Sequence, residues 1–128
     1  MTMQTIVVIE EDSAMRTLIC EWLLGEGYAV STRRANEAMP AGHDNDVGLV
    51  IVDLPNLRSR GAETIRTVRA RYPHSALIGL SAQLGRSMPG DSDAARALGL
   101  PRLVAKPCGR GELLDAVSES MGMPPPPA

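Results

Sequence analysis

Aromatic side chains are scarce in this sequence. Phenylalanine is absent, and Phe, Trp and Tyr together make up 2% of the 128 residues. Any hydrophobic core must therefore be aliphatic, and apolar residues supply 44% of the chain, which suffices for one ordinary domain. A chain of this length leaves little room for a second domain.

Other absences exclude several classes of protein. Two cysteines, Cys20 and Cys108, are too few for a disulfide framework and fit a reducing compartment. A net charge of −2 does not indicate the basic patch of a nucleic-acid binder. No apolar run approaches the ~20 residues of a membrane span, and the N-terminus lacks the basic and then apolar segments of a signal peptide. We expect a cytoplasmic protein whose domain binds neither nucleic acid nor a membrane.

The apolar residues predict strands that alternate with helices. Short apolar or β-branched runs predict strands at residues 6–9, 28–30, 47–52, 76–80 and 103–105. Apolar residues at helical spacing predict helices at residues 13–23, 34–39, 62–70, 94–98 and 113–121. Ser13 is the expected N-cap of the first helix, and Gly25 and Gly27 are expected to stop it.

This alternation, with short linkers, is typical of an α/β domain with a parallel sheet covered on both faces. Right-handed crossovers leave few topologies for such a sheet. We find no internal repeat, and we assign residues 1–121 to one domain. Residues 122–128 include Pro124 to Pro127 and form a Pro-rich tail or linker stub.

Polar side chains collect where the predicted strands end. Glu10 and Glu11 follow the first strand, Asp53 the third, Ser81 the fourth and Lys106 the fifth. Ligands of open α/β sheets bind outside the carboxyl ends of the strands. We therefore expect three carboxylates, a hydroxyl and an ammonium group to meet on one rim.

These groups are sufficient for phosphoryl transfer. Carboxylates in a small space repel one another, and a bound cation relieves the repulsion. Mg²⁺ prefers oxygen ligands, and it keeps waters beside one or two carboxylates and a phosphate. An Asp carboxylate can attack phosphorus to form an aspartyl phosphate, while a Lys and a hydroxyl stabilise the phosphoryl oxygens.

Four short motifs, in this order and at strand ends, resemble the response-regulator receiver family. They are Ile-Val-Val-Ile-Glu-Glu-Asp from residue 6, Val-Asp-Leu around Asp53 with Gly61 beyond it, Leu-Ser-Ala around Ser81, and Ala-Lys-Pro around Lys106. The resemblance covers about residues 5–121. It implies a flavodoxin-like doubly wound parallel sheet of five strands in the order 2-1-3-4-5.

The resemblance also implies a role for each rim residue. Asp53 accepts a phosphoryl group from a sensor histidine kinase or a phosphotransfer protein. Glu10, Glu11, Asp53 and the main-chain carbonyl of Pro55 hold Mg²⁺. Ser81 contacts the phosphoryl group. Lys106 pairs either with the phosphoryl group or with Asp53. The chain is then a phosphoacceptor signalling domain rather than an enzyme with a substrate of its own.

The implied partners follow from the same resemblance. The switched surface, about residues 92–120, meets a downstream protein partner or an output domain outside this chain. A homodimer is a further assembly that the sequence leaves open.

Three positions depart from the family pattern. Glu11 stands where Asp is usual, Leu57 where Pro is frequent, and Leu103 where most receivers carry Tyr or Phe. Asp12 is an alternative to Glu11 as the second acid. These departures support a rival, a pseudo-receiver that keeps the fold without being phosphorylated and acts through constitutive protein contacts.

Two other rivals have less support. A phosphatase that forms an acyl-phosphate intermediate would share the Asp nucleophile and Mg²⁺, but this chain has no extra segment to enclose a substrate. A flavodoxin needs hydroxyl residues after the first strand, and this chain has acids there.

Overall fold

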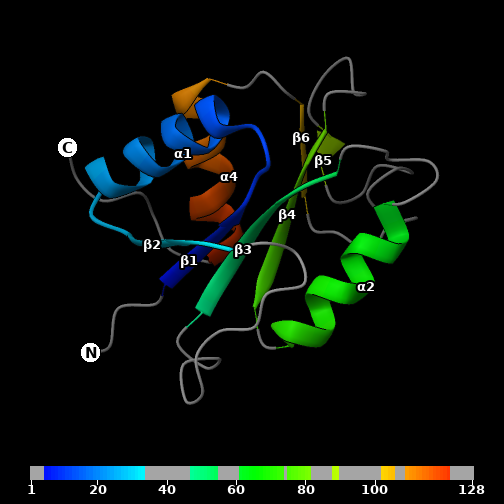
Figure 1. The fold of residues 1–128 in the computed structure, drawn as a ribbon. Coiled ribbons are helices and arrows are strands. Elements are labelled where there is room, and N and C mark those ends of the chain that lie inside the picture. The colour runs from blue at the N-terminus through cyan, green and yellow to red at the C-terminus, as the bar shows by residue number, and fades with distance from the viewer. Residues whose placement is uncertain are drawn as a thin grey trace.

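The computed structural model describes residues 5–33, 47–54, 61–73, 75–81, 88–89, 102–105 and 109–121. These residues form a six-stranded sheet with helices on both faces (Figure 1). The strands are β1 (Thr5–Ile9), β2 (Ala29–Thr32), β3 (Val47–Asp53), β4 (Ala76–Ser81), β5 (Met88–Pro89) and β6 (Arg102–Ala105). The helices are α1 (Ser13–Gly25), α2 (Gly61–Arg71) and α4 (Arg110–Met121).

The sheet has the predicted parallel topology. Its strand order is β2-β1-β3-β4-β6-β5, and all neighbours except the last pair run parallel. With β6 as the fifth parallel strand, the order 2-1-3-4-5 of a flavodoxin-like fold is confirmed. The sequence pattern does not predict β5, a two-residue strand that pairs antiparallel with β6 at the edge of the sheet.

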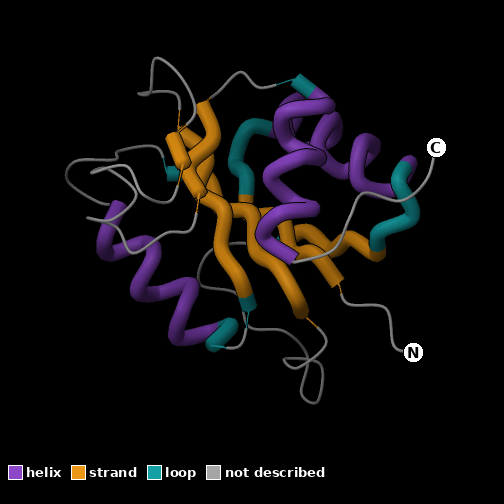
Figure 2. Tube along the Cα trace, turned by 180° about the vertical axis from the view of Figure 1, so that it is seen from behind, coloured by secondary structure: helices purple, strands orange, loops and turns teal. Residues whose placement is uncertain are grey.

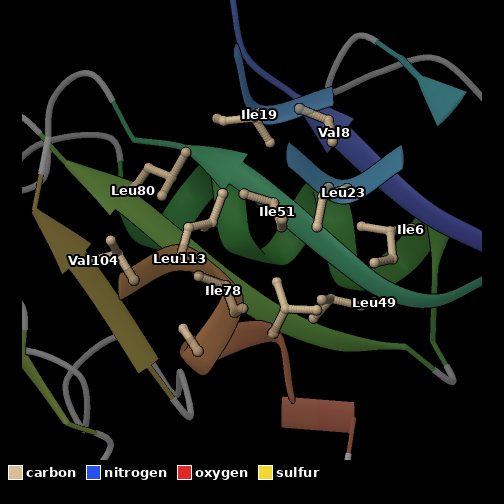
Figure 3. Packing of buried hydrophobic residues seen from close by; sticks show 12 residues of the cluster. Ile6, Val8, Ile19, Leu23, Leu49, Ile51, Ile78, Leu80, Val104 and Leu113 are labelled. Atoms are coloured by element: carbon tan, nitrogen blue, oxygen red, sulfur yellow. The ribbon is translucent and has the colours of Figure 1, made fainter. Parts of the chain in front are cut away.

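Alternation along the strands divides the core into two clusters. Successive side chains of a strand point to opposite faces of the sheet, and helices lie on both sides of it (Figure 2). The α2 cluster comprises Val7, Ile9, Val47, Val50, Val52, Leu54, Ile65, Val68, Tyr72, Leu77 and Leu103. The α1–α4 cluster, shown in Figure 3, comprises Ile6, Val8, Ile19, Leu23, Leu49, Ile51, Ile78, Leu80, Val104, Leu113, Ala116 and Val117. Because both faces of the sheet are apolar, polar chemistry is confined to the strand ends.

Asp12 rather than Ser13 caps α1. The Asp12 carboxylate accepts hydrogen bonds from the backbone N–H groups of Ala14 at 2.9 Å and Met15 at 3.2 Å. Ser13 is the first helical residue, so the predicted cap was wrong by one position. The predicted stop is confirmed, since Gly27 follows the helix with a φ of +89°, the left-handed conformation common at a helix end.

Some predictions fall on residues that the structure does not describe. They are the helices at 34–39 and 94–98 and the tail at 122–128. The strand predicted at 28–30 begins one residue later, as Ala29–Thr32. Within the described ranges, no helix combines the length and the apolar character that a membrane crossing requires.

Replacing Ile51 by Ala tests the two-sided core. Ile51 lies on β3 in the middle of the sheet, with 0% of its surface exposed. Truncation leaves a cavity there, so we expect the free energy of unfolding to fall by about 2–5 kcal/mol. Leu24→Ala is the control, because Leu24 is 58% exposed, and its loss should change stability by no more than ~0.5 kcal/mol. Urea unfolding followed by circular dichroism measures both, and equal losses would contradict the assigned core.

Candidate functional site

Parallel pairing places the carboxyl ends of β1, β3, β4 and β6 at the same end of the sheet (Figure 1). In the β1–β3 pair, Ile9 is the register partner of Val52. Glu10 and Asp53 each come one residue later, so they adjoin where these two strands end. The structure thus brings together the first acid of the rim and the predicted phosphoacceptor.

The acidic loop, defined as Glu10, Glu11 and Asp12, divides its three carboxylates among different tasks. Glu10 is buried, with 4% of its surface exposed, and its Oε1 accepts a hydrogen bond from the Asp12 backbone N–H at 3.1 Å. The Asp12 carboxylate is committed to the α1 N-cap. Glu11 is exposed and makes no hydrogen bond or ion pair with any residue in the described part of the chain. Of the two candidates for the second acid of the rim, Glu11 rather than Asp12 is therefore available to a ligand.

Asp53 is the last residue of β3 and is half-exposed. Ile51, two residues earlier, belongs to the α1–α4 cluster, so alternation directs Asp53 toward that face. The carboxylate thus lies at the carboxyl end of β3, on the side of the sheet that the α1–α4 cluster covers. Lys106 and Pro55, the other predicted neighbours of Asp53, lie outside the described residues.

Ser81 ends β4 beside Ala105 of β6, its register partner. It is fully buried, at 0% exposure. Leu77, four residues earlier in the same strand, belongs to the α2 cluster, so alternation directs Ser81 toward the face opposite to Asp53. The two strand ends are tied by the Leu54 N–H, which donates to the Leu80 carbonyl at 2.8 Å.

Sequence reasoning missed Arg16, a half-buried residue of α1. Its Nη1 donates a hydrogen bond to the main-chain carbonyl of Glu10 at 3.0 Å. Arg16 also lies one turn before Cys20 on α1. Burial raises the pKa of the Cys20 thiol, and the positive charge of Arg16 partly opposes that rise. A basic residue in the first turns of a helix that follows an acidic loop is the sequence signal that points to such a contact.

The donor set of this site fits Mg²⁺. Within the described ranges, no three His, Cys, Asp or Glu side chains lie close enough to hold a metal ion by themselves. Mg²⁺ does not need such a group, because it keeps several waters and binds through one or two carboxylates and phosphate oxygens. Glu10 and Asp53 offer carboxylates from adjoining strand ends, and Glu11 offers an exposed third.

Comparison with known proteins agrees with this arrangement. A family model described as the response regulator receiver domain matches residues 6–118. The chain belongs to the response regulator receiver family. Receiver domains act in two-component signalling, where they interact with histidine kinases and output partners rather than turning over a substrate as enzymes do.

Solved receiver structures share the fold at low sequence identity. The chemotaxis protein CheY4 of Vibrio cholerae is similar with a TM-score of 0.71 and 20% identity, over 92% of this chain and 98% of that one. A CheY-like receiver of Methanospirillum hungatei has a TM-score of 0.70 and 19% identity, over 94% of each chain. The receiver domain of a Pseudomonas aeruginosa sensor histidine kinase has a TM-score of 0.65 and 22% identity, over 94% of this chain and 98% of that one, and holds magnesium in its active-site cleft.

Leu103 occupies the position at which most receivers carry an aromatic residue. Leu103 is fully buried, at 0% exposure, and belongs to the α2 cluster. It is the register partner of Gly79 on one side and of Met88 on the other. A leucine enclosed in this way offers no exposed ring whose rotamer could report the state of Asp53.

Replacing Asp12 tests its assignment to the helix cap. Asp12→Ala removes the acceptor for two N–H groups of α1, so we expect a loss of about 1 kcal/mol in the free energy of unfolding, measured in chelator. Asp12→Asn should retain most of the stability, because Asn is as good an N-cap as Asp. If both variants lose equally, the charge of Asp12 matters more than its hydrogen bonds, and the cap assignment fails.

Proposed function

We propose that this receiver domain accepts a phosphoryl group on Asp53 in a Mg²⁺-dependent reaction and uses it to switch a partner-binding surface. The observation that best supports the proposal is the parallel register of β1 and β3, which sets Glu10 beside Asp53. The residue that would accept the phosphoryl group and a residue that would hold the cation therefore follow adjoining strand ends, although the two are far apart in sequence.

Asp53 acts as the nucleophile in this proposal. One of its carboxylate oxygens attacks phosphorus and a new O–P bond forms, while the bond from phosphorus to the donor imidazole nitrogen breaks with its electron pair. A small acyl phosphate reacts in the same way, with the acyl oxygen as the leaving atom. The half-exposed position of Asp53 leaves its carboxylate accessible to a donor.

Glu10 and Glu11 would hold Mg²⁺ together with Asp53 and the main-chain carbonyl of Pro55. When bound, the cation neutralises charge on the phosphoryl oxygens during transfer. Glu10 is oriented at the strand end by its hydrogen bond from the Asp12 N–H. Glu11 is exposed, and its side chain can turn toward a cation without breaking a contact.

Ser81 and Lys106 would stabilise the phosphoryl group once it is on Asp53. A hydroxyl donates a hydrogen bond to a phosphoryl oxygen, and an ammonium group neutralises part of its charge. Ser81 is buried and lies toward the opposite face from Asp53, so the end of β4 must move for the hydroxyl to make this contact. Movement of the β4 end would start the conformational switch, because it couples the phosphoryl charge on Asp53 to a second conformation of the partner-binding surface.

The phosphoryl donor is a sensor histidine kinase or a phosphotransfer protein. The switched surface, about residues 92–120, would then bind a downstream protein, an output domain or a second copy of this chain. A net charge of −2 gives the domain little attraction for nucleic acid or anionic membranes. We place its action in the cytoplasm.

Two observations favour a pseudo-receiver as the second candidate. Leu103 is fully buried. It also has no aromatic ring whose rotamer could change when Asp53 is phosphorylated. Glu11 replaces the usual Asp, and its longer side chain has more freedom to lose when it binds a cation. A pseudo-receiver would use the same fold for a constitutive protein contact.

An intact-mass measurement distinguishes the two candidates. After incubation with Mg²⁺ and acetyl phosphate, we expect the protein to gain the mass of one phosphoryl group, because Asp53 then attacks an activated donor. Asp53→Asn should abolish the gain, since the amide is a poor nucleophile, and a chelator should abolish it in the unchanged protein.

Glu21→Gln is the matched control, since Glu21 is an exposed acid on α1, and it should phosphorylate like the unchanged protein. Absence of any gain in a folded sample, at every Mg²⁺ concentration, would refute phosphoacceptor function and leave the pseudo-receiver.

A further inference from the structure

Arg16 reaches back from α1 to the acidic loop. Its Nη1 donates to the main-chain carbonyl of Glu10 at 3.0 Å, a contact that spans six residues of sequence. The side chain is half-buried, so the hydrogen bond is partly shielded from water. The backbone N–H of Arg16 also donates to the Asp12 carbonyl at 2.9 Å, which ties the same residue to both ends of the loop.

The Arg16 contact differs from the other hydrogen bonds of the loop. The bond from the Asp12 N–H to Glu10 Oε1 is local and shapes the turn itself. The guanidinium instead holds the main chain of Glu10, at the junction between β1 and the turn, against α1. A hydrogen bond from a charged donor is also stronger than a neutral one.

We propose that Arg16 is a positioning residue for the divalent cation, holding the acidic loop in the conformation from which Glu10 and Glu11 bind it. This inference rests on the cation site of the proposed function. Its physical basis is that a ligand whose main chain is already fixed loses less conformational entropy on binding. Partners that orient metal ligands typically change metal affinity by about 10–100-fold when they are removed.

The charge of Arg16 acts in the opposite direction. A guanidinium repels a nearby divalent cation, and its removal alone would strengthen binding. Because Arg16 is only half-buried, solvent and salt screen this repulsion, whereas a water molecule in place of the guanidinium would not tie the Glu10 carbonyl to α1. The positioning effect should therefore dominate, and the sign of the change in affinity decides between the two effects.

Calorimetric titration with Mg²⁺ alone, and with Mn²⁺ alone, tests the proposal without any phosphoryl donor. Arg16→Met removes both the hydrogen bond and the charge, and we expect the Kd for either cation to rise about tenfold. Arg16→Lys keeps a charged donor on a long side chain, so it should restore the Kd to within about threefold of the unchanged protein. Arg66→Met, which removes an exposed arginine from α2, should leave the Kd unchanged.

Thermal unfolding in chelator separates positioning from general stability. A substitution that only destabilises the fold lowers the melting temperature but leaves the Kd of the folded protein unaltered, and that result would overturn the proposal. An unchanged or lower Kd in Arg16→Met would overturn it as well. If Arg16→Met does not fold, Arg16→Gln replaces it, and its Kd must exceed that of Arg16→Lys for the proposal to stand.

The outcome for the unchanged protein distinguishes failure of this inference from failure of the proposed function. If the unchanged protein binds the cations and Arg16→Met binds them equally well, only the role of Arg16 is refuted. If the unchanged protein binds neither cation, both the cation site and the role of Arg16 fall.

Discussion

The structure depends on the parallel register of its buried strands. Since side chains alternate between two apolar layers, a slip of one residue would turn every core side chain of a strand to the wrong face. The register of β1 on β3 is therefore fixed by Val7 and Val50 on one face and by Val8 and Ile51 on the other. The same register decides which residues emerge together at the carboxyl ends, so core packing also positions the site.

The scarcity of aromatic residues has a consequence for any switch in this receiver. β-branched and leucine side chains fill the two layers, and Tyr72 is the aromatic residue that is fully buried among the described residues. Leu103 is held in the α2 cluster between β4 and β5. Under the proposed function, a structural change at the site would therefore travel through strand ends and backbone pairing rather than through the rotation of a ring. The buried Ser81, beside Ala105 of β6, is the side chain best placed to begin it.

Hydrophobic runs predicted the ends of the main strands because they report burial directly, while the strand order came from the resemblance to the receiver family. The sequence also predicted that Glu10 and Asp53 would follow neighbouring strand ends at one edge of the sheet, which the register of β1 and β3 bears out. It predicted Ser13 rather than Asp12 as the cap, and this was wrong by one position, because both residue types cap helices well. The choice depends on the turn that Glu10 makes with the Asp12 N–H, which is a matter of backbone conformation.

Other features left no periodic signal in the sequence. β5 is a two-residue strand that contains a proline, Met88–Pro89, and so short a segment carries no alternation. The Arg16 contact joins a side chain to a main-chain carbonyl, and every residue has such a carbonyl. Contacts of this kind follow from the path of the chain, so the charge pattern points to such a contact but the main-chain acceptor is identified only when the loop and the helix are placed together.

Under the proposed function, the different contacts of the three acids in the acidic loop explain how a cation site can include Glu11. Glu10 is buried and accepts a hydrogen bond from the Asp12 N–H, and Asp12 accepts from two N–H groups of α1, so backbone donors already engage two of the three acids. Glu11 is exposed, and its additional methylene group meets no packing constraint. The longer side chain therefore costs entropy when it is fixed on a cation, because it has one more rotatable bond to immobilise. On this reasoning the replacement of Asp by Glu weakens a cation site without blocking it, and it increases the importance of whatever holds the loop in place.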